Sequence, residues 1–189
     1  MEHNYIKLTY KDKIRFGCLR CGRCCSSGPN VGLTAFDIHR IARFLDLNWR
    51  ELKGRYIIAV IADMIAIPTL RDIGGGRCVF LEYINRQPSC SIYPVRPIRC
   101  RLYPFIPPNL SKERIVYVDR CCPGLDTGAE IDPPWRLLEE YRLETKIHYS
   151  KLYRLIFEEG YEPLNALERI IEDVKRTKTF RREAIRVIH

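Results

Sequence analysis

The run Cys18-Leu-Arg-Cys21-Gly-Arg-Cys24-Cys25 places four thiols within eight residues. Cysteine at this density indicates metal ligation, disulfide bonding or redox chemistry at sulfur. Consecutive Cα atoms lie about 3.8 Å apart, which is too close for an unstrained disulfide between Cys24 and Cys25. Cys18, Cys21 and Cys24 recur at every third residue and can converge on one side of a tight turn. The spacing therefore favours metal, and a metal held here would organise the fold around it.

Two kinds of metal site fit the run. Cys-x2-Cys-x2-Cys with a remote fourth thiolate is typical of the iron–sulfur clusters of bacterial ferredoxins. A single Cys-x2-Cys is also half of a zinc site. Adjacent side chains point in different directions, so Cys25 is expected to reach a different ion, or a different cluster atom, from Cys24. We predict an iron–sulfur cluster, of the 4Fe-4S type, with zinc as the alternative.

Five further cysteines follow in the first two-thirds of the chain: Cys78, Cys90, Cys100, Cys121 and Cys122. Residues 77–84 and 89–93 are predicted to pair as a hairpin, which brings Cys78 and Cys90 near one another. Cys100 lies in a proline-rich segment, residues 93–109, that is predicted to be rigid with at most one helical turn. A buried structural role is the alternative for any one of them, since free cysteine is among the most buried residue types.

The composition is typical of one folded domain. The chain has 189 residues, of which 46% are hydrophobic, and this suffices for a sizeable core. No apolar run approaches the roughly 20 residues that span a bilayer, and the first residues lack the features of a secretory signal. We therefore predict a single cytoplasmic domain over residues 1–189. In a reducing cytosol, thiols this numerous are more often metal ligands than disulfides.

A depletion of thermolabile residues points to a hot environment. The chain has a single glutamine, Gln87, and two methionines, and it is rich in Ile, Arg, Glu and Lys. Some hyperthermophiles keep disulfides inside the cell, so disulfide bonding stays an alternative to metal ligation. The odd total of nine cysteines leaves at least one thiol outside any set of intramolecular pairs.

The formal charge of +9 favours a polyanionic or acidic partner. The densest basic run, residues 175–182, is interpreted as a solvated helical face, so nucleic acid is the weaker choice beside an acidic or redox protein partner. Thiolates around a metal carry negative charge that guanidinium groups offset. Arginines between the cysteines are therefore of interest: Arg20, Arg23, Arg96, Arg99, Arg101 and Arg120. We take Arg96, Arg99 and Arg101 as candidate cofactor-binding residues, with surface solvation as the alternative.

The rest of the pattern predicts an α+β fold. Residues 14–18 and 115–118 alternate like short strands, and residues 57–70 are β-branched, with Asp63 as a turn residue. Thr34 is predicted to cap a helix that ends near Leu47, with Asp37 at its third position. Asn48 is predicted to cap a second helix that carries Trp49, Leu52 and Tyr56.

The last third of the chain changes character and lacks cysteine. Pro133 and Pro134 suit the start of a long amphipathic helix that runs to Ile156 and ends at Gly160. Apolar residues from Leu164 to Ile188 predict a final helix. The expected architecture is a cysteine-rich, metal-organised core of short strands and helices over residues 13–125, followed by a packed helical hairpin over residues 132–189.

The order of these motifs resembles a known family. Phe16-Gly-Cys18-x2-Cys21-Gly-x-Cys24-Cys25 is followed by Cys78-Val-Phe-Leu, by Cys90-x-Ile-Tyr93-x2-Arg96-Pro97-x2-Cys100-Arg101-x-Tyr103-Pro104-Phe105, and by Cys122-Pro-Gly. The set resembles the CxxCxxCC family of zinc- or iron-chelating proteins, which includes the flagellin lysine N-methylases. The resemblance runs from about Phe16 to Gly124.

The resemblance implies a metal more directly than a reaction. The family's eight cysteines fall on Cys18, Cys21, Cys24, Cys25, Cys78, Cys90, Cys100 and Cys122. Cys121 departs from the pattern and is the alternative to Cys122 as the last ligand. Eight thiolates would fill two four-cysteine sites, or one cluster with spare thiols.

Three functions compete on this basis. The first is an iron–sulfur protein used in electron transfer, metal handling or redox maturation. The second is a protein lysine N-methyltransferase, although the sequence offers only the glycines 74–76 as a cofactor loop, and a turn is the simpler interpretation of them. The third is a zinc-stabilised module that binds nucleic acid or an acidic partner. No catalytic residue is assigned, and whether the protein is an enzyme stays open at this point.

Overall fold

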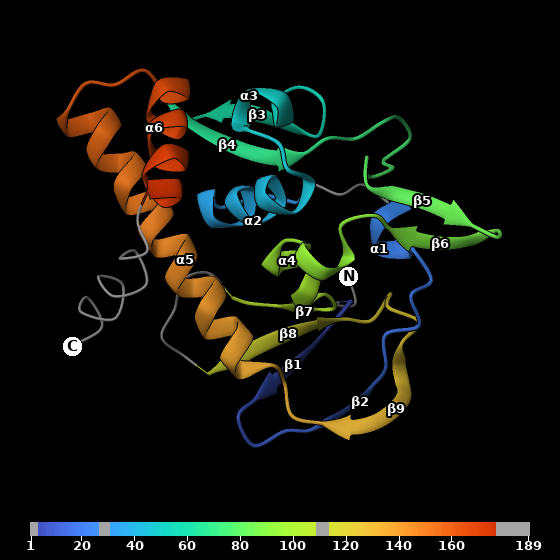
Figure 1. Cartoon of the computed structure of the whole chain (residues 1–189). Helices are drawn as coiled ribbons and strands as arrows, with labels where there is room; N and C mark the ends of the chain where they lie inside the picture. The colour runs from blue at the N-terminus through green and yellow to red at the C-terminus, as the bar shows by residue number, and fades with distance from the viewer. Residues whose placement is uncertain (1–3, 27–30, 109–113, 177–189) are drawn as a thin grey trace.

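The computed structural model describes residues 4–26, 31–108 and 114–176 (Figure 1). The elements in chain order are β1 (Tyr5–Thr9), β2 (Ile14–Phe16), α1 (Arg23–Ser26), α2 (Ala35–Leu45), α3 (Trp49–Leu52), β3 (Ile57–Ala62), β4 (Ile65–Leu70), β5 (Leu81–Ile84), β6 (Gln87–Cys90), the 3-10 turn η1 (Tyr93–Val95), α4 (Ile98–Leu102), β7 (Phe105–Ile106), β8 (Ile115–Asp119), β9 (Leu125–Ile131), α5 (Trp135–Tyr153), the π-helical turn η2 (Arg154–Glu158) and α6 (Pro163–Arg176). The predicted α+β class is confirmed.

The strands form four small antiparallel sheets in the described part of the chain. One has three strands in the order β1-β8-β7, and β2–β9, β3–β4 and β5–β6 form two-stranded ribbons. An isolated two-stranded ribbon is marginally stable in water. The ribbons therefore depend on what packs against them, and this dependence matters most for the two that flank the cysteines.

Two hydrophobic clusters lie along the long helix α5. One joins α2, α6, the β3–β4 ribbon and the C-terminal part of α5, with Ile38, Ile41 and Leu167 fully buried. The other joins β1, β8, α4 and the first turns of α5, where Leu102 and Leu138 are buried. Figure 1 shows α5 running diagonally past both groups, with α6 folded back beside it. The expected C-terminal helices are present, and α5 contributes to both cores.

Capping residues set the start of two helices as predicted. The Thr34 hydroxyl accepts from the Asp37 N–H, and the Asp37 carboxylate accepts from the Thr34 N–H, which forms a complete capping box. Asn48 and Glu51 form a second capping box at α3. Two lengths differ from prediction: α2 ends at Leu45, and α3 is a single turn that ends before Tyr56.

Residues 57–70 form a hairpin of two strands, because the chain reverses at Asp63 and Met64. Both residues have positive φ, as a tight turn between twisted strands requires. The expectation for Asp63 is confirmed. Pro68 lies inside β4, opposite Ala59.

The proline-rich segment contains more helix than the single turn predicted. η1 and α4 are separate short helices, and Pro94 and Pro97 lie in or next to the first turn of each. Proline is tolerated at the start of a helix, where its missing N–H would have had no intrahelical acceptor. The prolines here begin helices, and this places Cys100 on α4.

The final helix, α6, ends at Arg176 in the described part of the chain. Ile188 lies outside the described residues, as does most of the basic run 175–182. No helix among the described ranges has both the length and the apolar character needed to cross a membrane.

Candidate metal centre

The first cysteines are held by a close contact between two backbone segments. The Gly17 N–H donates to the Gly124 carbonyl at 3.0 Å, and Phe16 of β2 pairs with Leu125 of β9. A Cβ atom on Gly124 would overlap the Gly17 carbonyl oxygen, so only glycine allows this approach. The contact brings the chain entering Cys18 next to the turn that carries Cys122.

The last cysteines of the run rest on the β5–β6 ribbon. The Cys78 N–H donates to the Cys25 carbonyl at 2.8 Å. Gly22 has φ +71°, and a Cβ on it would lie 2.6 Å from the Pro88 Cβ of β6. Glycine at this position therefore lets the run lie directly against the ribbon.

The same ribbon brings Cys78 and Cys90 together, as predicted. Cys90 pairs with Leu81 across the ribbon, and the Leu81 N–H donates to the Cys78 carbonyl at 3.0 Å. The two-residue turn at Asn85 and Arg86 has positive φ at both positions, which matches the twist of a tight hairpin. The turn is shorter than the predicted Asn85–Pro88 segment.

Cys100 approaches the group from α4, which is tied to α2. The Ile98 N–H, at the first residue of α4, donates to Asp37 Oδ1 at 3.0 Å. Burial raises the pKa of the Cys100 thiol, and the Cys78, Cys24 and Cys90 thiolates raise it further. Cys100 therefore lies among the thiols of the run and of the ribbon.

The adjacent pair Cys24–Cys25 does not ionise as two equal thiols. Their Sγ atoms are 3.9 Å apart. A hydrogen bond from Cys25 lowers the pKa of Cys24 to about 7, with a contribution from the positive charge of Arg96. The same hydrogen bond raises the pKa of Cys25. One thiolate therefore forms readily, and the second proton leaves only when something replaces it.

The remaining thiols also raise one another's pKa. Burial raises the pKa of Cys78, and that of Cys90, and neighbouring thiolates add to both shifts. Burial also raises the pKa of Cys122, with the Cys21 and Cys18 thiolates adding to it.

All nine cysteines lie within the described residues and none forms a disulfide. As placed, no three His, Cys, Asp or Glu side chains of the described ranges are close enough to hold one ion.

The three candidate arginines lie in different places. The guanidinium of Arg96 stacks on the Tyr93 ring at 3.9 Å from its centroid, and Arg20 stacks on the same ring at 4.5 Å. Arg96 also lowers the pKa of Cys24, after the larger effect of the Cys25 hydrogen bond. Arg20 and Arg96 together link the first cysteine run to the segment between Cys90 and Cys100.

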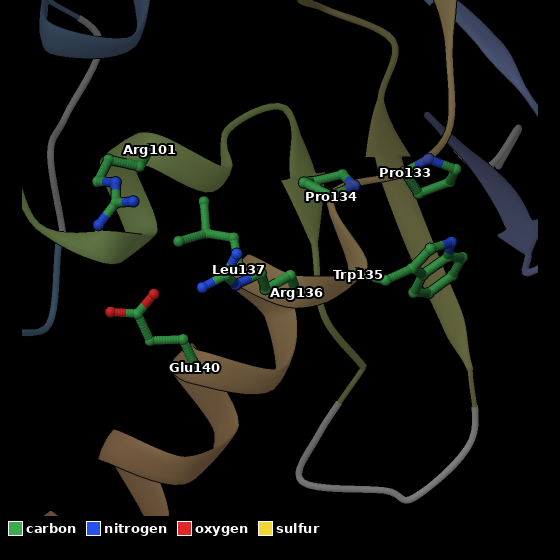
Figure 2. Close-up of a pocket in the computed structure, with 7 residues that line it drawn as sticks. All are labelled: Arg101, Pro133, Pro134, Trp135, Arg136, Leu137 and Glu140. Carbon is green, nitrogen blue, oxygen red and sulfur yellow. The ribbon is translucent and has the colours of Figure 1, made fainter. Parts of the chain in front are cut away.

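Arg99 and Arg101 are directed towards α5. Arg101 lines a pocket of about 640 Å³ with Trp135 and Glu140 from the first turns of α5, and Figure 2 shows Arg101 on its short helix above Glu140 of the long helix. The charge of Arg99 acts on Tyr149, whose pKa burial raises. Arg99 and Arg101 flank Cys100 on α4, while the charge of Arg96 lowers the pKa of Cys24 and opposes the rise in that of Cys90.

The glycines 74–76 form a closed turn. The Gly74 and Gly76 N–H groups donate to the Asp72 carboxylate at 2.5 and 2.9 Å. These donors are thus already satisfied by the chain itself, as in an ordinary Asx-type turn. The turn interpretation made from sequence agrees with this geometry.

One buried cluster next to the thiols was not predicted as a unit. Arg40 donates to Asp37 at 2.6 Å and to both carboxylate oxygens of Glu144 on α5, at 2.6 and 2.8 Å. His148 is fully buried beside it and accepts from the Ala35 N–H through Nδ1 at 3.3 Å. The sequence signalled only the cap at Asp37, because Glu144 and His148 lie more than 100 residues away.

A family model described as a "Putative zinc- or iron-chelating domain", CxxCxxCC, matches residues 17–123. The chain belongs to the CxxCxxCC family. The match begins at Gly17 and ends just after Cys122, and so includes every thiol described above. Membership of this zinc- or iron-chelating family supports metal binding by this CxxCxxCC protein.

An uncharacterised protein of Methanocaldococcus jannaschii is similar to the chain along nearly its full length. The two are 31% identical over 183 residues, which cover 92% of this chain and 90% of that protein. The similarity therefore includes the C-terminal helices as well as the cysteine-rich part. No solved structure matches the chain.

Proposed function

We propose that this CxxCxxCC protein is an iron–sulfur protein that exchanges electrons with a protein partner. The observation that carries the proposal is the approach of cysteine-bearing backbone segments: the Cys78 N–H donates to the Cys25 carbonyl, and the Gly17 N–H, next to Cys18, donates to the Gly124 carbonyl in the turn that follows Cys122. Two glycine contacts, at Gly22 and Gly124, support this approach, since any side chain there would push the segments apart.

The donor set suits iron–sulfur or zinc. Thiolates are soft ligands, and both metals are held by sets of four cysteines. The run Cys-x2-Cys-x2-Cys with a remote thiolate favours the iron–sulfur cluster. When bound, such a cluster would supply one-electron chemistry. Its ligands would come from Cys18, Cys21, Cys24, Cys25, Cys78, Cys90, Cys100 and Cys122, four to a cluster, and Arg96 would offset part of its negative charge.

The exposure of the thiols supports exchange with a partner. Cys18, Cys21 and Cys24 are exposed, while Cys78 is buried. A cluster held here would reach the surface on one side and the core on the other. The guanidinium groups of Arg20 and Arg96 stack on the Tyr93 ring, between the cysteine run and Cys100. Their positive charge favours an acidic or redox partner surface.

Anaerobic purification followed by iron, zinc and acid-labile sulfide analysis tests the metal. We expect iron with near-equimolar sulfide and an electron paramagnetic resonance signal that appears on reduction with dithionite and disappears on reoxidation. Zinc without a visible chromophore would replace the iron–sulfur proposal by a zinc site. Iron that leaves the protein for a chelator during each redox cycle would favour metal handling over electron transfer.

A further inference from the structure

The β3–β4 ribbon carries an uncharged apolar surface that the rest of the described chain leaves exposed. Ile58, Val60, Ile61 and Met64 are between 41% and 61% exposed. Asp63, at the turn, is the one charged residue in the stretch 57–70. Figure 1 shows the ribbon at the top of the molecule, far from β2 and β9. On a chain with a formal charge of +9, an apolar cluster of this kind marks an interaction surface.

The outer edge of β4 is already occupied. The Leu33 N–H donates to the Pro68 carbonyl at 2.7 Å, and the Leu70 N–H donates to the Val31 carbonyl at 3.2 Å. The backbone groups of Pro68 and Leu70 therefore point away from β3. Pro68 suits such a position, because its missing N–H takes no bond from the ribbon. A further strand can join this ribbon only beside β3.

Beside β3, two residues present open backbone groups. Hydrogen-bonded and non-hydrogen-bonded pairs alternate along an antiparallel ribbon. Since Pro68 and Leu70 point outwards, their partners Ala59 and Ile57 do so too, and Ile61 follows by the same alternation. The Ile57 carbonyl accepts from the Gly54 N–H at 2.7 Å, which closes the edge at that end. In the described ranges, no segment bonds to the outward N–H and C=O groups of Ala59 and Ile61.

These open groups are arranged symmetrically about Val60. A second β3 strand that runs antiparallel, with the two Val60 residues opposite each other, places Ala59 of each copy opposite Ile61 of the other. Each such pair exchanges both of its N–H···O=C bonds, so every open group on both copies is used. The second strand reaches its turn at Asp63 where the first edge closes at Ile57. The segment at Gly54 therefore does not obstruct it.

The charges at the two ends of the ribbon fit the same arrangement. Asp63 gives the tip a negative charge. At the base, the Arg55 guanidinium stacks on the Tyr56 ring at 4.8 Å, and Arg71 donates to the Gly54 carbonyl at 2.8 Å. In an antiparallel pair the tip of one copy lies beside the base of the other. The acidic tip then meets a basic base at both ends, and this complementarity favours a second copy as the partner.

We propose that the protein forms a homodimer through antiparallel pairing of β3 with β3 of a second copy. The result is a four-stranded sheet in the order β4-β3-β3-β4. The interface is isologous, because the same surface is used on both copies. An exposed, uncharged edge strand is a template for pairing with other chains, and the dimer removes this edge. The proposal is independent of the metal.

Analytical ultracentrifugation of the full-length protein tests the dimer. A reductant is present, so that disulfides between the exposed thiols of two copies do not imitate one. We expect the wild type at twice the 22.3 kDa of one chain. Val60→Lys places two ammonium groups opposite each other and is expected to halve the mass. Ile84→Lys is the matched control, because Ile84 is a similarly exposed residue of the β5–β6 ribbon, and it is expected to stay dimeric.

A second measurement uses the wild type alone. Amide hydrogen exchange is followed over a dilution series, because dilution dissociates a dimer. We expect the amides of Ala59 and Ile61 to be protected at high protein concentration and to exchange faster on dilution. The amides of Ile58 and Val60 bond to β4 within the ribbon, so their exchange should change less.

The outcomes are distinct. A monomeric wild type would overturn the proposal, as would a dimer that persists unchanged in Val60→Lys. Equal dissociation in Val60→Lys and Ile84→Lys would place the interface elsewhere and overturn it too. Where circular dichroism shows that Val60→Lys does not fold, the exchange measurement decides. Exchange at Ala59 and Ile61 that stays the same while the dimer dissociates would then contradict the pairing.

Discussion

Gly124 lies against the backbone of Gly17, and the space between the two segments admits no side chain. Gly124→Ala is expected to separate them, because a methyl group there would overlap the Gly17 carbonyl. Overpacking of this kind costs about 1–3 kcal/mol. We expect a lower free energy of unfolding by that amount and a loss of metal from the thiols near Cys122. Chemical denaturation and metal analysis measure the two effects.

Gly32→Ala is the matched control for this substitution. A Cβ on Gly32 would have Ile67 as its nearest neighbour at 4.0 Å, and its φ is outside the left-handed region. We expect wild-type metal content and stability within about 0.5 kcal/mol. Equal losses in both variants would show that the Gly17–Gly124 contact has no special part in holding the thiols.

His148 makes the free energy of unfolding depend on pH. Burial lowers its pKa from the ordinary 6.5 to about 4, partly opposed by the charge of Asp37. The folded state therefore holds the proton less well than the unfolded state. The stability due to neutral His148 is complete above pH 6.5 and is lost as the pH falls towards 4. The shift corresponds to roughly 3 kcal/mol at most.

His148→Gln is expected to remove this acid-dependent loss. Urea denaturation of the wild type and the variant at several pH values between 7 and 4, in the same metal state, gives the difference. His39→Gln is the comparison, because burial lowers the pKa of His39 as well but this side chain is only partly buried, so its removal should take away a smaller part of the acid loss than removal of His148. An identical pH dependence in the wild type and His148→Gln would contradict the prediction.

Helix α2 joins the thiols to the long helix α5 through its first turn. Asp37 accepts from the Ile98 N–H of α4 and from Arg40, and Arg40 in turn holds Glu144 of α5. The cluster is largely buried, and α4 carries Cys100. The Asp37 carboxylate thus joins α2 to α4 directly and to α5 through Arg40, and the position of Cys100 depends on it.

Asp37→Ala is expected to destabilise the protein by about 3–5 kcal/mol, because Arg40 and the Ile98 N–H lose a buried partner. Asp37→Asn should cost less, since its side-chain oxygen can still accept from Ile98. Thermal or chemical denaturation measures both. Glu168→Gln breaks the exposed ion pair with Lys53 and should cost less than about 1 kcal/mol. A similar cost for Asp37→Ala and Glu168→Gln would contradict a structural role for the buried cluster.

The whole molecule has hydrophobic cores of its own around α2, α5 and α6, while the thiols lie between small ribbons. Removal of metal by a chelator under reducing conditions is therefore expected to loosen the ribbons first. Hydrogen exchange should accelerate at residues 17–26 and 78–90 and around Cys122. Amides of α2 and α6 should remain protected, because their burial does not depend on the thiols.

Uniform acceleration over all segments after metal removal would mean that the metal organises the entire fold. An unchanged exchange pattern would mean that it contributes nothing to stability. A lower melting temperature alone does not distinguish these cases, since any ligand of the folded state raises it. The exchange measurement on the metal-loaded and metal-free protein therefore decides how far the metal's influence extends.

The amino-acid sequence by itself determined the features that depend on neighbouring residues. The spacing of Cys18, Cys21, Cys24 and Cys25 indicated a metal-binding turn, and Thr34 and Asp37 predicted a capping box that is present. The start of α5 followed from prolines and helical periodicity, and the end of the helical segment followed from Gly160; α5 itself ends at Tyr153, and the π-helical turn η2 continues the segment to Glu158. These are local interactions, which short-range chemistry decides.

Only the tertiary structure decided which residues from distant segments meet. It placed the turn that carries Cys122 beside the start of the cysteine run, and Cys78 beside Cys25 at the end of the run. It also set Arg96 where its charge acts on Cys24, and Arg101 in a pocket with the first turns of α5. Spacing along the chain carries no record of these pairings, because they result from the close packing of segments that lie far apart in the sequence. The thiols were evident from the sequence, and their grouping came from the fold.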